Sequence, residues 1–208
     1  LRERLGRIIV AESNSGKPVT AEDLGAAGSM ALLLREAMLP NLVQTLEGNP
    51  AFVHCGPFAN IAHGNSSIIA DELALSRSDY VVTEAGFGAE MGAEKALHIK
   101  SLASGISPSC IVLNVTVRSM KLHGGGVAGG GGSRPTKDEI ETENVEAVRS
   151  GASSNLRRHI KNLAATSIPV VVSINRFHAD TDAEIEAIRD EAAKAGAFDI
   201  VLFDGFSK

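Results

Sequence analysis

The side chains of this sequence that could do chemistry fall into four groups, each placed just after a short apolar run. In chain order they are Asn60, His63, Asn65 and Ser66; Thr83 and Glu84 with Gly86 and Gly88; Arg118, Lys121 and His123 with Gly124 and Gly125; and Asn175 with Arg176. Cationic side chains and glycine amides can hold phosphate oxygens, and a carboxylate can orient a magnesium ion or its water. We therefore predict a ligand site, with residues 118–125 as an anion-handling loop and residues 60–66 as its polar neighbour.

Five apolar runs, several rich in β-branched residues, predict the strands that position these groups. They are residues 51–54, 80–83, 110–116, 169–174 and 198–203, and stretches with a helical pattern lie between them at residues 66–76, 88–104, 136–149, 154–165 and 180–195. Near-continuous apolar runs are typical of strands buried in a parallel sheet. The alternation predicts an α/β fold, an open and mostly parallel sheet with helices on both faces, like that of P-loop nucleotide hydrolases. Ligands bind such sheets at the carboxyl ends of the strands, where the polar groups fall.

The first 50 residues follow a different pattern. Residues 28–38 are strongly helical, so we predict a helical segment or subdomain over residues 1–50, attached to a parallel α/β core over residues 51–208. Within that core, Asp180-Thr181-Asp182 can accept hydrogen bonds from the first free amides of a helix, and Gly196 can adopt the left-handed conformation that ends it.

Composition excludes several classes of function. The 208 residues include 25 acidic and 20 basic side chains, a net charge of −5, which argues against a general surface for nucleic acids or anionic membranes. No apolar run approaches the roughly 20 residues needed to cross a bilayer. Cys55 and Cys110 are predicted to be free core thiols in a reducing compartment. Metal binding by Cys55 with His54 and His63 is the alternative, but the spacing matches no zinc motif.

Three stretches of the sequence leave their interpretation open. Glu84-Ala85-Gly86-Phe87-Gly88 is similar to the acidic motif with which P-loop proteins orient magnesium, although a glutamate at this place can also cap the next helix. Asn175-Arg176 stands where nucleotide-binding proteins of that class have an Asn-Lys pair that contacts the base. The stretch 124–132, with seven glycines, fits a linker or a ligand loop equally well. Neither Gly-x-x-x-x-Gly-Lys-Ser/Thr nor a strand–Gly-x-Gly-x-x-Gly–helix unit occurs in the sequence.

Longer segments resemble one family throughout the chain. Thr116-Val-Arg-Ser-Met-Lys-Leu-His-Gly-Gly125 is similar to a signature of formate–tetrahydrofolate ligases, with Ser119-Met120 where Ala-Leu is more usual. Gly56-Pro-Phe-Ala-Asn-Ile-Ala-His-Gly64 and Val82-Thr-Glu-Ala-Gly-Phe-Gly-Ala89 also agree with the family, as do residues 18–24, 40–47 and 180–185. Asn175-Arg-Phe stands where the family has Asn-Lys-Phe.

The resemblance implies an enzyme that joins formate to tetrahydrofolate at the expense of ATP. Formate attacks the terminal phosphate to give formyl phosphate, and the folate amine then attacks the formyl carbon. The implied cofactors are ATP, Mg²⁺ and a monovalent cation (K⁺ or NH₄⁺), and the implied setting is a cytoplasmic homotetramer. The family's P-loop would precede residue 1 and its pterin-binding aromatic pair would follow residue 208. This chain, which ends just after a predicted strand, is thus expected to be an internal fragment that is inactive alone.

Roles follow residue by residue from the same resemblance. We expect the phosphoryl or formyl oxygens to lie near Lys121, Arg118 and the amides of Gly124 and Gly125. We expect magnesium or its water near Glu84. His63 and His123 are expected to orient formate or relay a proton. Asn175 is expected at the nucleotide, and Asn60, Asn65 and Ser66 are expected to bind substrate or nucleotide.

Two alternatives remain. The first is a different ATP- or GTP-dependent protein of the P-loop nucleotide-hydrolase class, such as another ligase or a switch protein, which would also need a P-loop upstream but would ignore formate. A degenerate homologue kept as a scaffold is the second alternative, and it should have lost Lys121, His63 or Glu84, all of which are present.

Overall fold

The computed structural model of the chain describes residues 1–55, 63–126 and 136–205. The chain forms two compact units, Leu1–Ser104 and Gly105–Lys208, and each is described by itself. The division expected at residue 50 stays a prediction.

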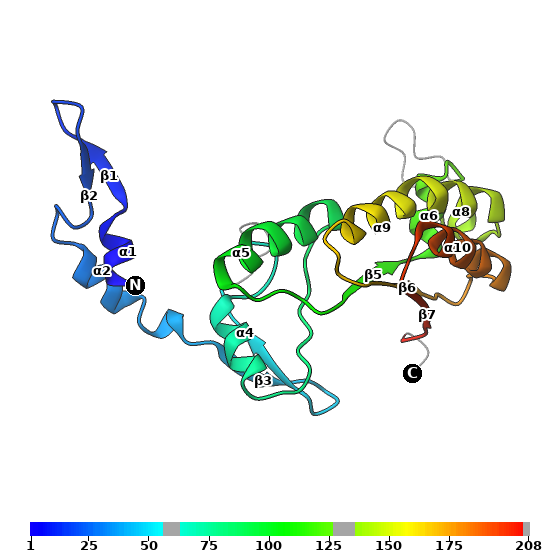
Figure 1. The fold of residues 1–208 in the computed structure, drawn as a ribbon, viewed down its shortest axis with the longest axis horizontal. Helices are drawn as coiled ribbons and strands as arrows, with labels where there is room; N and C mark the ends of the chain where they lie inside the picture. The colour runs from blue at the N-terminus through cyan, green and yellow to red at the C-terminus, as the bar shows by residue number, and fades with distance from the viewer. Residues whose placement is uncertain (56–62, 127–135, 206–208) are drawn as a thin grey trace. The chain divides into compact units, whose positions relative to one another are not determined.

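The first unit begins with small helices and a hairpin (Figure 1). Helix α1 spans Arg2–Gly6 and α2 spans Ala27–Leu33, followed by the 3₁₀ turn η1 at Glu36–Met38; between α1 and α2, strands β1 (Ile9–Glu12) and β2 (Pro18–Thr20) pair antiparallel. The predicted helical character of the N-terminal segment is confirmed, with an added β-hairpin.

Two of the five predicted parallel strands lie in this unit and are not part of a parallel sheet. Residues 51–53 belong to β4 (Pro50–Val53), which pairs antiparallel with β3 (Asn41–Gln44). The turn between them closes where Gly48 adopts φ +84°, so a local turn decides the pairing. Residues 80–83 form no strand, and Tyr80 and Val82 are 90% and 96% exposed. Their β-branched composition favours an extended backbone, but it does not determine whether another strand pairs with them.

The two helices predicted for the first unit are present. Helix α4 spans Ile68–Leu75, and the Ser67 hydroxyl caps it by accepting a hydrogen bond from the Ala70 amide at 3.0 Å. The second is built from two π-helical turns, η2 (Ala89–Ala93) and η3 (Ala96–Lys100), and α5 (Ser101–Ser104).

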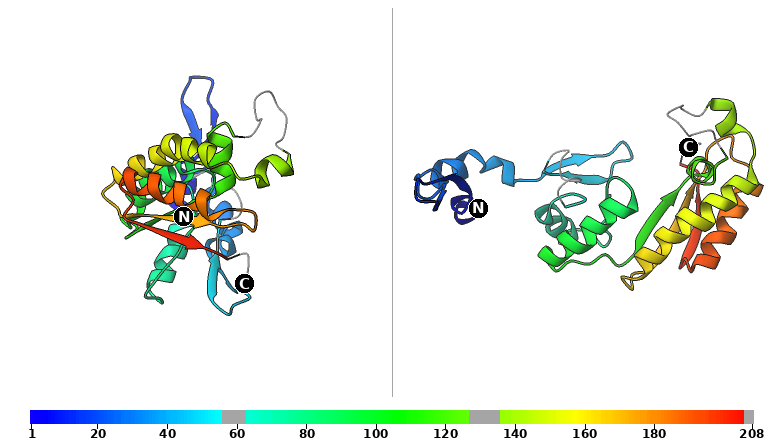
Figure 2. Two further views of the ribbon diagram at one scale, coloured as in Figure 1. Left: turned by 90° about the vertical axis from the view of Figure 1, so that its right-hand side faces the viewer. Right: turned by 90° about the horizontal axis from the view of Figure 1, so that it is seen from above.

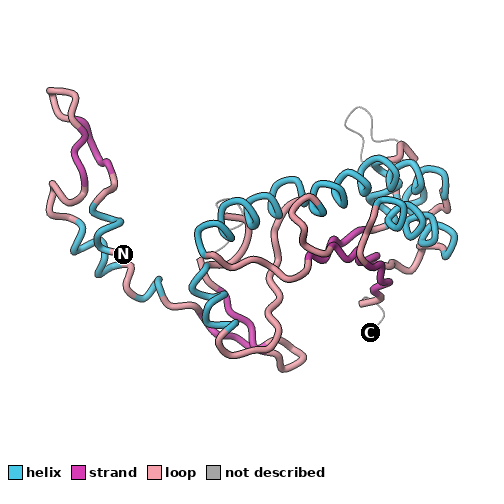
Figure 3. The backbone as a smooth tube through the Cα atoms, viewed as in Figure 1, coloured by secondary structure: helices cyan, strands magenta, loops and turns pink. Residues whose placement is uncertain are grey.

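The second unit is a three-stranded parallel sheet with helices packed against it. The strands are β5 (Ile111–Val115), β6 (Val170–Asn175) and β7 (Asp199–Phe203), in the order β5-β6-β7. The helices are α6 (Val117–His123), α7 (Lys137–Glu141), α8 (Val145–Gly151), α9 (Arg157–Ala164) and α10 (Asp182–Ala195). The π-helical turn η4 (Ala152–Leu156) joins α8 to α9 in one continuous helix (Figure 3). The predicted α/β class with an open parallel sheet is confirmed.

The core of this unit lies on one face of the sheet. Val172 and Ile174 on that face are fully buried and pack with Val148, Ile160 and Ile188 from the helices. Figures 1 and 2 show the helices on that side. On the opposite face Val112 is 65% exposed and Val201 41% exposed. The alternation of buried and exposed side chains along β5 follows from this one-sided packing.

Helix α10 begins and ends as its sequence predicts. Thr181 caps it in a reciprocal arrangement with Glu184, the side chain of each accepting from the amide of the other, and Gly196 at φ +91° ends it.

The cysteines depart from expectation. Cys55 and Cys110 are free, as predicted, but both are exposed rather than buried in the core. Cys110 precedes the edge strand β5, where one-sided packing leaves it uncovered. Among the described residues, no helix is long and apolar enough to cross a membrane.

Candidate functional site

In the second unit, the carboxyl ends of β5 and β6 bring two predicted site residues to one edge. Val115 pairs with Ile174 in parallel register. The segment after β5, which carries Arg118, therefore emerges beside the end of β6, whose last residue is the half-buried Asn175. The Arg118 guanidinium carbon lies 4.4 Å from the centre of the Phe177 ring. Such stacking orients a guanidinium, whose in-plane donors suit planar oxyanions.

The segment predicted as an anion-handling loop is largely a helix. This corrects its expected conformation, while its role in anion handling stays a prediction. Residues 117–123 form α6, because the Thr116 hydroxyl accepts from the Ser119 amide at 3.1 Å and the Ser119 hydroxyl lies 3.3 Å from the Thr116 amide, a capping box with serine in place of the usual glutamate. The Gly124 and Gly125 amides donate to the α6 carbonyls of Met120 and Leu122. These amides therefore complete the helix end, where the dipole disfavours anions.

Gly124 lies at a close contact between two helices. A Cβ at this position would lie 1.8 Å from the Ala147 carbonyl oxygen, so the backbones of α6 and α8 touch here. His123, on the last turn of α6, is exposed.

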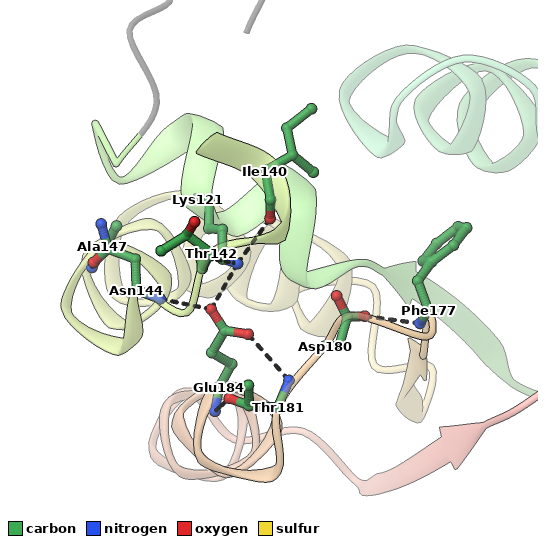
Figure 4. A network of polar contacts seen from close by, with 9 residues as sticks. All are labelled: Lys121, Ile140, Thr142, Asn144, Ala147, Phe177, Asp180, Thr181 and Glu184. Carbon is green, nitrogen blue, oxygen red and sulfur yellow. Dashed lines mark hydrogen bonds and ion pairs between the residues drawn. The ribbon is translucent and has the colours of Figure 1, made fainter. Parts of the chain in front are cut away.

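Lys121 lies in the interior of the second unit (Figure 4). Its side chain is 1% exposed, and its Nζ is 2.7 Å from the Glu184 Oε1 and donates to the carbonyl oxygens of Ile140 and Thr142, each at 2.9 Å. The structure does not test its expected contact with the phosphoryl or formyl oxygens. The contacts of the ammonium nevertheless favour a different role, which is developed below.

The pKa values of two carboxylates in this region, those of Asp180 and Glu184, are shifted in opposite directions. Burial raises the pKa of Asp180, and the Phe177 amide, which donates to Oδ2 at 2.8 Å, lowers it only in part. Burial alone would raise the pKa of Glu184 as well. There the hydrogen bonds from the Lys121 ammonium and from the amides of Asn144 and Thr181 outweigh burial and hold the pKa below its ordinary value.

In the first unit, the two other predicted groups meet through backbone contacts. The Gly86 amide donates to the Gly64 carbonyl at 3.0 Å, which joins the segment of His63, Asn65 and Ser66 to the segment of Glu84. Glycine is required at this contact, because Gly64 has φ +96° and a Cβ there would lie 2.5 Å from the Gly92 carbonyl oxygen.

Three polar atoms of the first group are buried and have no hydrogen-bond partner among the described residues. They are His63 Nε2, Asn65 Oδ1 and Ser66 Oγ, and the Asn65 residue is 5% exposed. An unmatched buried polar atom costs about 1–3 kcal/mol, so a native chain that keeps several together is suited to a polar ligand. Ser66 also lines a pocket formed with α4 and the segment of residues 78–83.

Glu84 is the candidate for magnesium, and its carboxylate is exposed. The described residues contain no cluster of three His, Cys, Asp or Glu side chains that could hold a metal alone. Magnesium bound with a nucleotide needs only one or two protein carboxylates besides the phosphates, so an exposed Glu84 fits that use. Asn60 and most of the segment 56–64 lie outside the described residues.

The predicted site residues thus fall in two units. His63, Asn65, Ser66 and Glu84 belong to the first, whereas Arg118, Lys121, His123, Gly124, Gly125 and Asn175 belong to the second. Sequence reasoning missed Glu184 and the stacking of Arg118 on Phe177. Thr181-x-x-Glu184 was an available signal, because this spacing is typical of a capping box.

Comparison with known proteins gives one consistent result. The sequence profile of the family described as "Formate--tetrahydrofolate ligase" matches residues 1–208. A formate–tetrahydrofolate ligase of Desulforamulus reducens is 54% identical over 199 residues, 95% of this chain and 34% of the relative. One from Granulibacter bethesdensis is 56% identical over 196 residues, 94% of this chain and 32% of the relative.

A eukaryotic relative agrees. The cytoplasmic C-1-tetrahydrofolate synthase of Pongo abelii is 52% identical over 204 residues, 97% of this chain and 22% of the relative. The chain thus spans about a third or less of the length of these curated relatives. A profile match over every residue, with relatives above half identity, shows that the chain belongs to the formate–tetrahydrofolate ligase family.

Proposed function

We propose that this sequence forms part of an ATP-dependent ligase that activates formate as formyl phosphate and transfers the formyl group to tetrahydrofolate, giving 10-formyltetrahydrofolate. The observation that carries the proposal is the family match over residues 1–208, together with relatives above 50% identity that are named for this activity. The chain spans about a third of those relatives, so the activity is proposed for the complete protein and not for these residues alone.

Both steps of this reaction develop negative charge on oxygen atoms, and preorganised donors stabilise such charge. Arg118 is the cation of the second unit best suited to this task, because Phe177 orients its guanidinium at the carboxyl edge of the sheet. Asn175 at the end of β6 is placed to contact a ligand at the same edge, and the exposed His123 is the weaker candidate for proton transfer.

In the first unit, His63, Asn65 and Ser66 would bind formate or nucleotide through the buried polar atoms that have no partner in the described part of the chain. Glu84 would hold Mg²⁺, either directly or through its water, and the ion would neutralise phosphate charge when bound. A monovalent cation, a homotetrameric assembly and a cytoplasmic location remain expectations from the family.

The test is an assay of the complete protein for 10-formyltetrahydrofolate, with formate, ATP or tetrahydrofolate omitted in turn. Product that requires all three substrates is expected. ATP hydrolysis indifferent to formate would instead favour another nucleotide enzyme, and a folded protein with no ATP-dependent chemistry would favour a scaffold. The 208 residues alone are expected to form no product. Detectable synthesis by them would contradict our proposal that the activity requires the complete protein.

A further inference from the structure

Lys121 has the surroundings of a residue that holds structure in place. Its ammonium carries three protons, and its partners are the Glu184 carboxylate at 2.7 Å and the carbonyls of Ile140 and Thr142 at 2.9 Å. The side chain is 1% exposed. An ammonium with three near partners and no exposed surface has no donor left for a substrate oxygen.

Glu184 extends the same contact to two more elements (Figure 4). Its Oε1 also accepts from the amide of Asn144, the cap residue of α8, at 2.8 Å, and its Oε2 accepts from the Thr181 amide at the start of α10. The residue is completely buried. One ion pair thus joins the middle of α6 to the end of α7 and to the starts of α8 and α10.

Helix α6 is therefore fixed on several sides. Gly124 and Gly151 bring its backbone against α8, and Lys121 ties it to α7 and α10. Arg118 lies one turn before Lys121 on this helix, and its ring partner Phe177 lies in the connection between β6 and α10, where the Phe177 amide donates to Asp180. The position of the Arg118 guanidinium thus depends on where α6 sits against the start of α10.

We propose that Lys121 and Glu184 are positioning residues of the ligase, which act by holding α6 so that Arg118 is presented at the carboxyl edge of the sheet. This inference rests on the proposed function. It also explains why Lys121, which lies in a segment similar to a family signature, points into the protein. Removing Lys121 alone would leave the Glu184 carboxylate buried without its counter-charge, which distorts the surroundings more than removing both charges.

The test compares turnover in the complete protein for Lys121→Met, Glu184→Gln and the double variant, each corrected for its folded fraction by circular dichroism. Lys121→Met is expected to lower kcat by about 100-fold, the scale of an ångström-sized misplacement. The double variant is expected to recover most of that loss. If the lysine touches the transferring group instead, the double variant will stay as inactive as Lys121→Met, and that result would overturn the proposal.

A second arm asks whether Lys121 acts through Arg118. In an Arg118→Ala background, Lys121→Met should add little further loss of kcat, because residues that act as a unit are not additive. If Lys121→Met lowers kcat by the same factor in the Arg118→Ala background as in the wild type, the inference is contradicted. Arg149→Met is the matched control, since the exposed Arg149 side chain also joins α8 to α10, by ion pairs to the exposed Asp190 and the buried Glu191; unchanged kcat is expected. A wild-type protein that makes no 10-formyltetrahydrofolate would refute the proposed function rather than this inference.

Discussion

The contact between α6 and α8 is close enough that one methyl group should separate the helices. A Cβ at Gly151 would lie 2.1 Å from the Met120 carbonyl oxygen and 3.0 Å from the Gly124 amide nitrogen, well inside the 3.4–4 Å of ordinary contact. The neighbouring atoms are backbone and cannot rotate away. Gly151→Ala must therefore displace α6, the helix that carries Arg118.

The expected size follows from two opposing terms. Replacing a helical glycine by alanine favours folding by about 1 kcal/mol through helix propensity, whereas inserting a methyl into a packed interface costs about 1–3 kcal/mol and sometimes more. Because the contact here is to backbone, we expect the upper part of that range and a net loss of about 1–2 kcal/mol. In a unit of about 100 residues each kcal/mol lowers Tm by about 4–8 °C.

The assay is urea and thermal unfolding of the 208-residue chain, with Ser150→Ala as the control. Ser150 precedes Gly151 on the same helix and is exposed, so the same alanine there should change stability by no more than about 0.5 kcal/mol. Gly124→Ala should be non-additive with Gly151→Ala, because both open one interface. If Gly151→Ala unfolds at the same midpoint as Ser150→Ala, the backbone contact described here is not the one that the folded protein makes.

Further predictions concern the carboxylates and the α10 cap. Glu184 has a depressed pKa when folded, so its contribution to stability is present above the unfolded-state pKa and is lost as pH falls through the folded-state value. Glu184→Gln should flatten this acid limb in urea midpoints measured against pH, and an unaltered limb would argue against the pair. Asp180 has the opposite sign: its pKa is raised, so stability declines as pH rises from the unfolded-state to the folded-state value, and Asp180→Asn should abolish that decline. Thr181→Ala should cost about 1 kcal/mol in urea unfolding, and no loss would mean that its hydroxyl does not cap the helix. In the complete protein, Glu84→Gln should raise the magnesium concentration for half-maximal rate, whereas an unchanged titration would leave Glu84 a structural role.

Local signals in the sequence were sufficient for part of this fold. Helix α10 could be predicted because its cap residues and its terminal glycine are consecutive with the helix they delimit. Strands β5, β6 and β7 could be predicted because burial against helices requires apolar runs. The run at residues 51–54 was equally apolar, yet its strand pairs with β3 across a short turn. Strand composition indicates extended backbone, while the pairing partner depends on contacts that composition does not encode.

The ion pair between Lys121 and Glu184 could not be predicted from the sequence. A lysine three residues after an arginine, in front of glycines, suggests a cluster of charges facing an anion. Both residues lie on α6, which begins after the capping box of Thr116 and Ser119, and side chains three positions apart on a helix are neighbours. Residues 118 and 121 are one turn apart, and only the packing of α7, α8 and α10 decides that Lys121 is enclosed while Arg118 remains half-buried at the edge.

The candidate residues can therefore be sorted by whether their polar atoms already have partners. Lys121 satisfies all of its donors within the protein, and we assign it to positioning. His63, Asn65 and Ser66 keep buried polar atoms that nothing in the described chain satisfies, at a cost of about 1–3 kcal/mol for each atom. Packing alone would favour apolar side chains at such places. Retention of polar ones is most simply explained by a ligand that supplies the missing hydrogen bonds, so this segment is the part of the first unit where bound substrate or nucleotide should protect the chain most strongly.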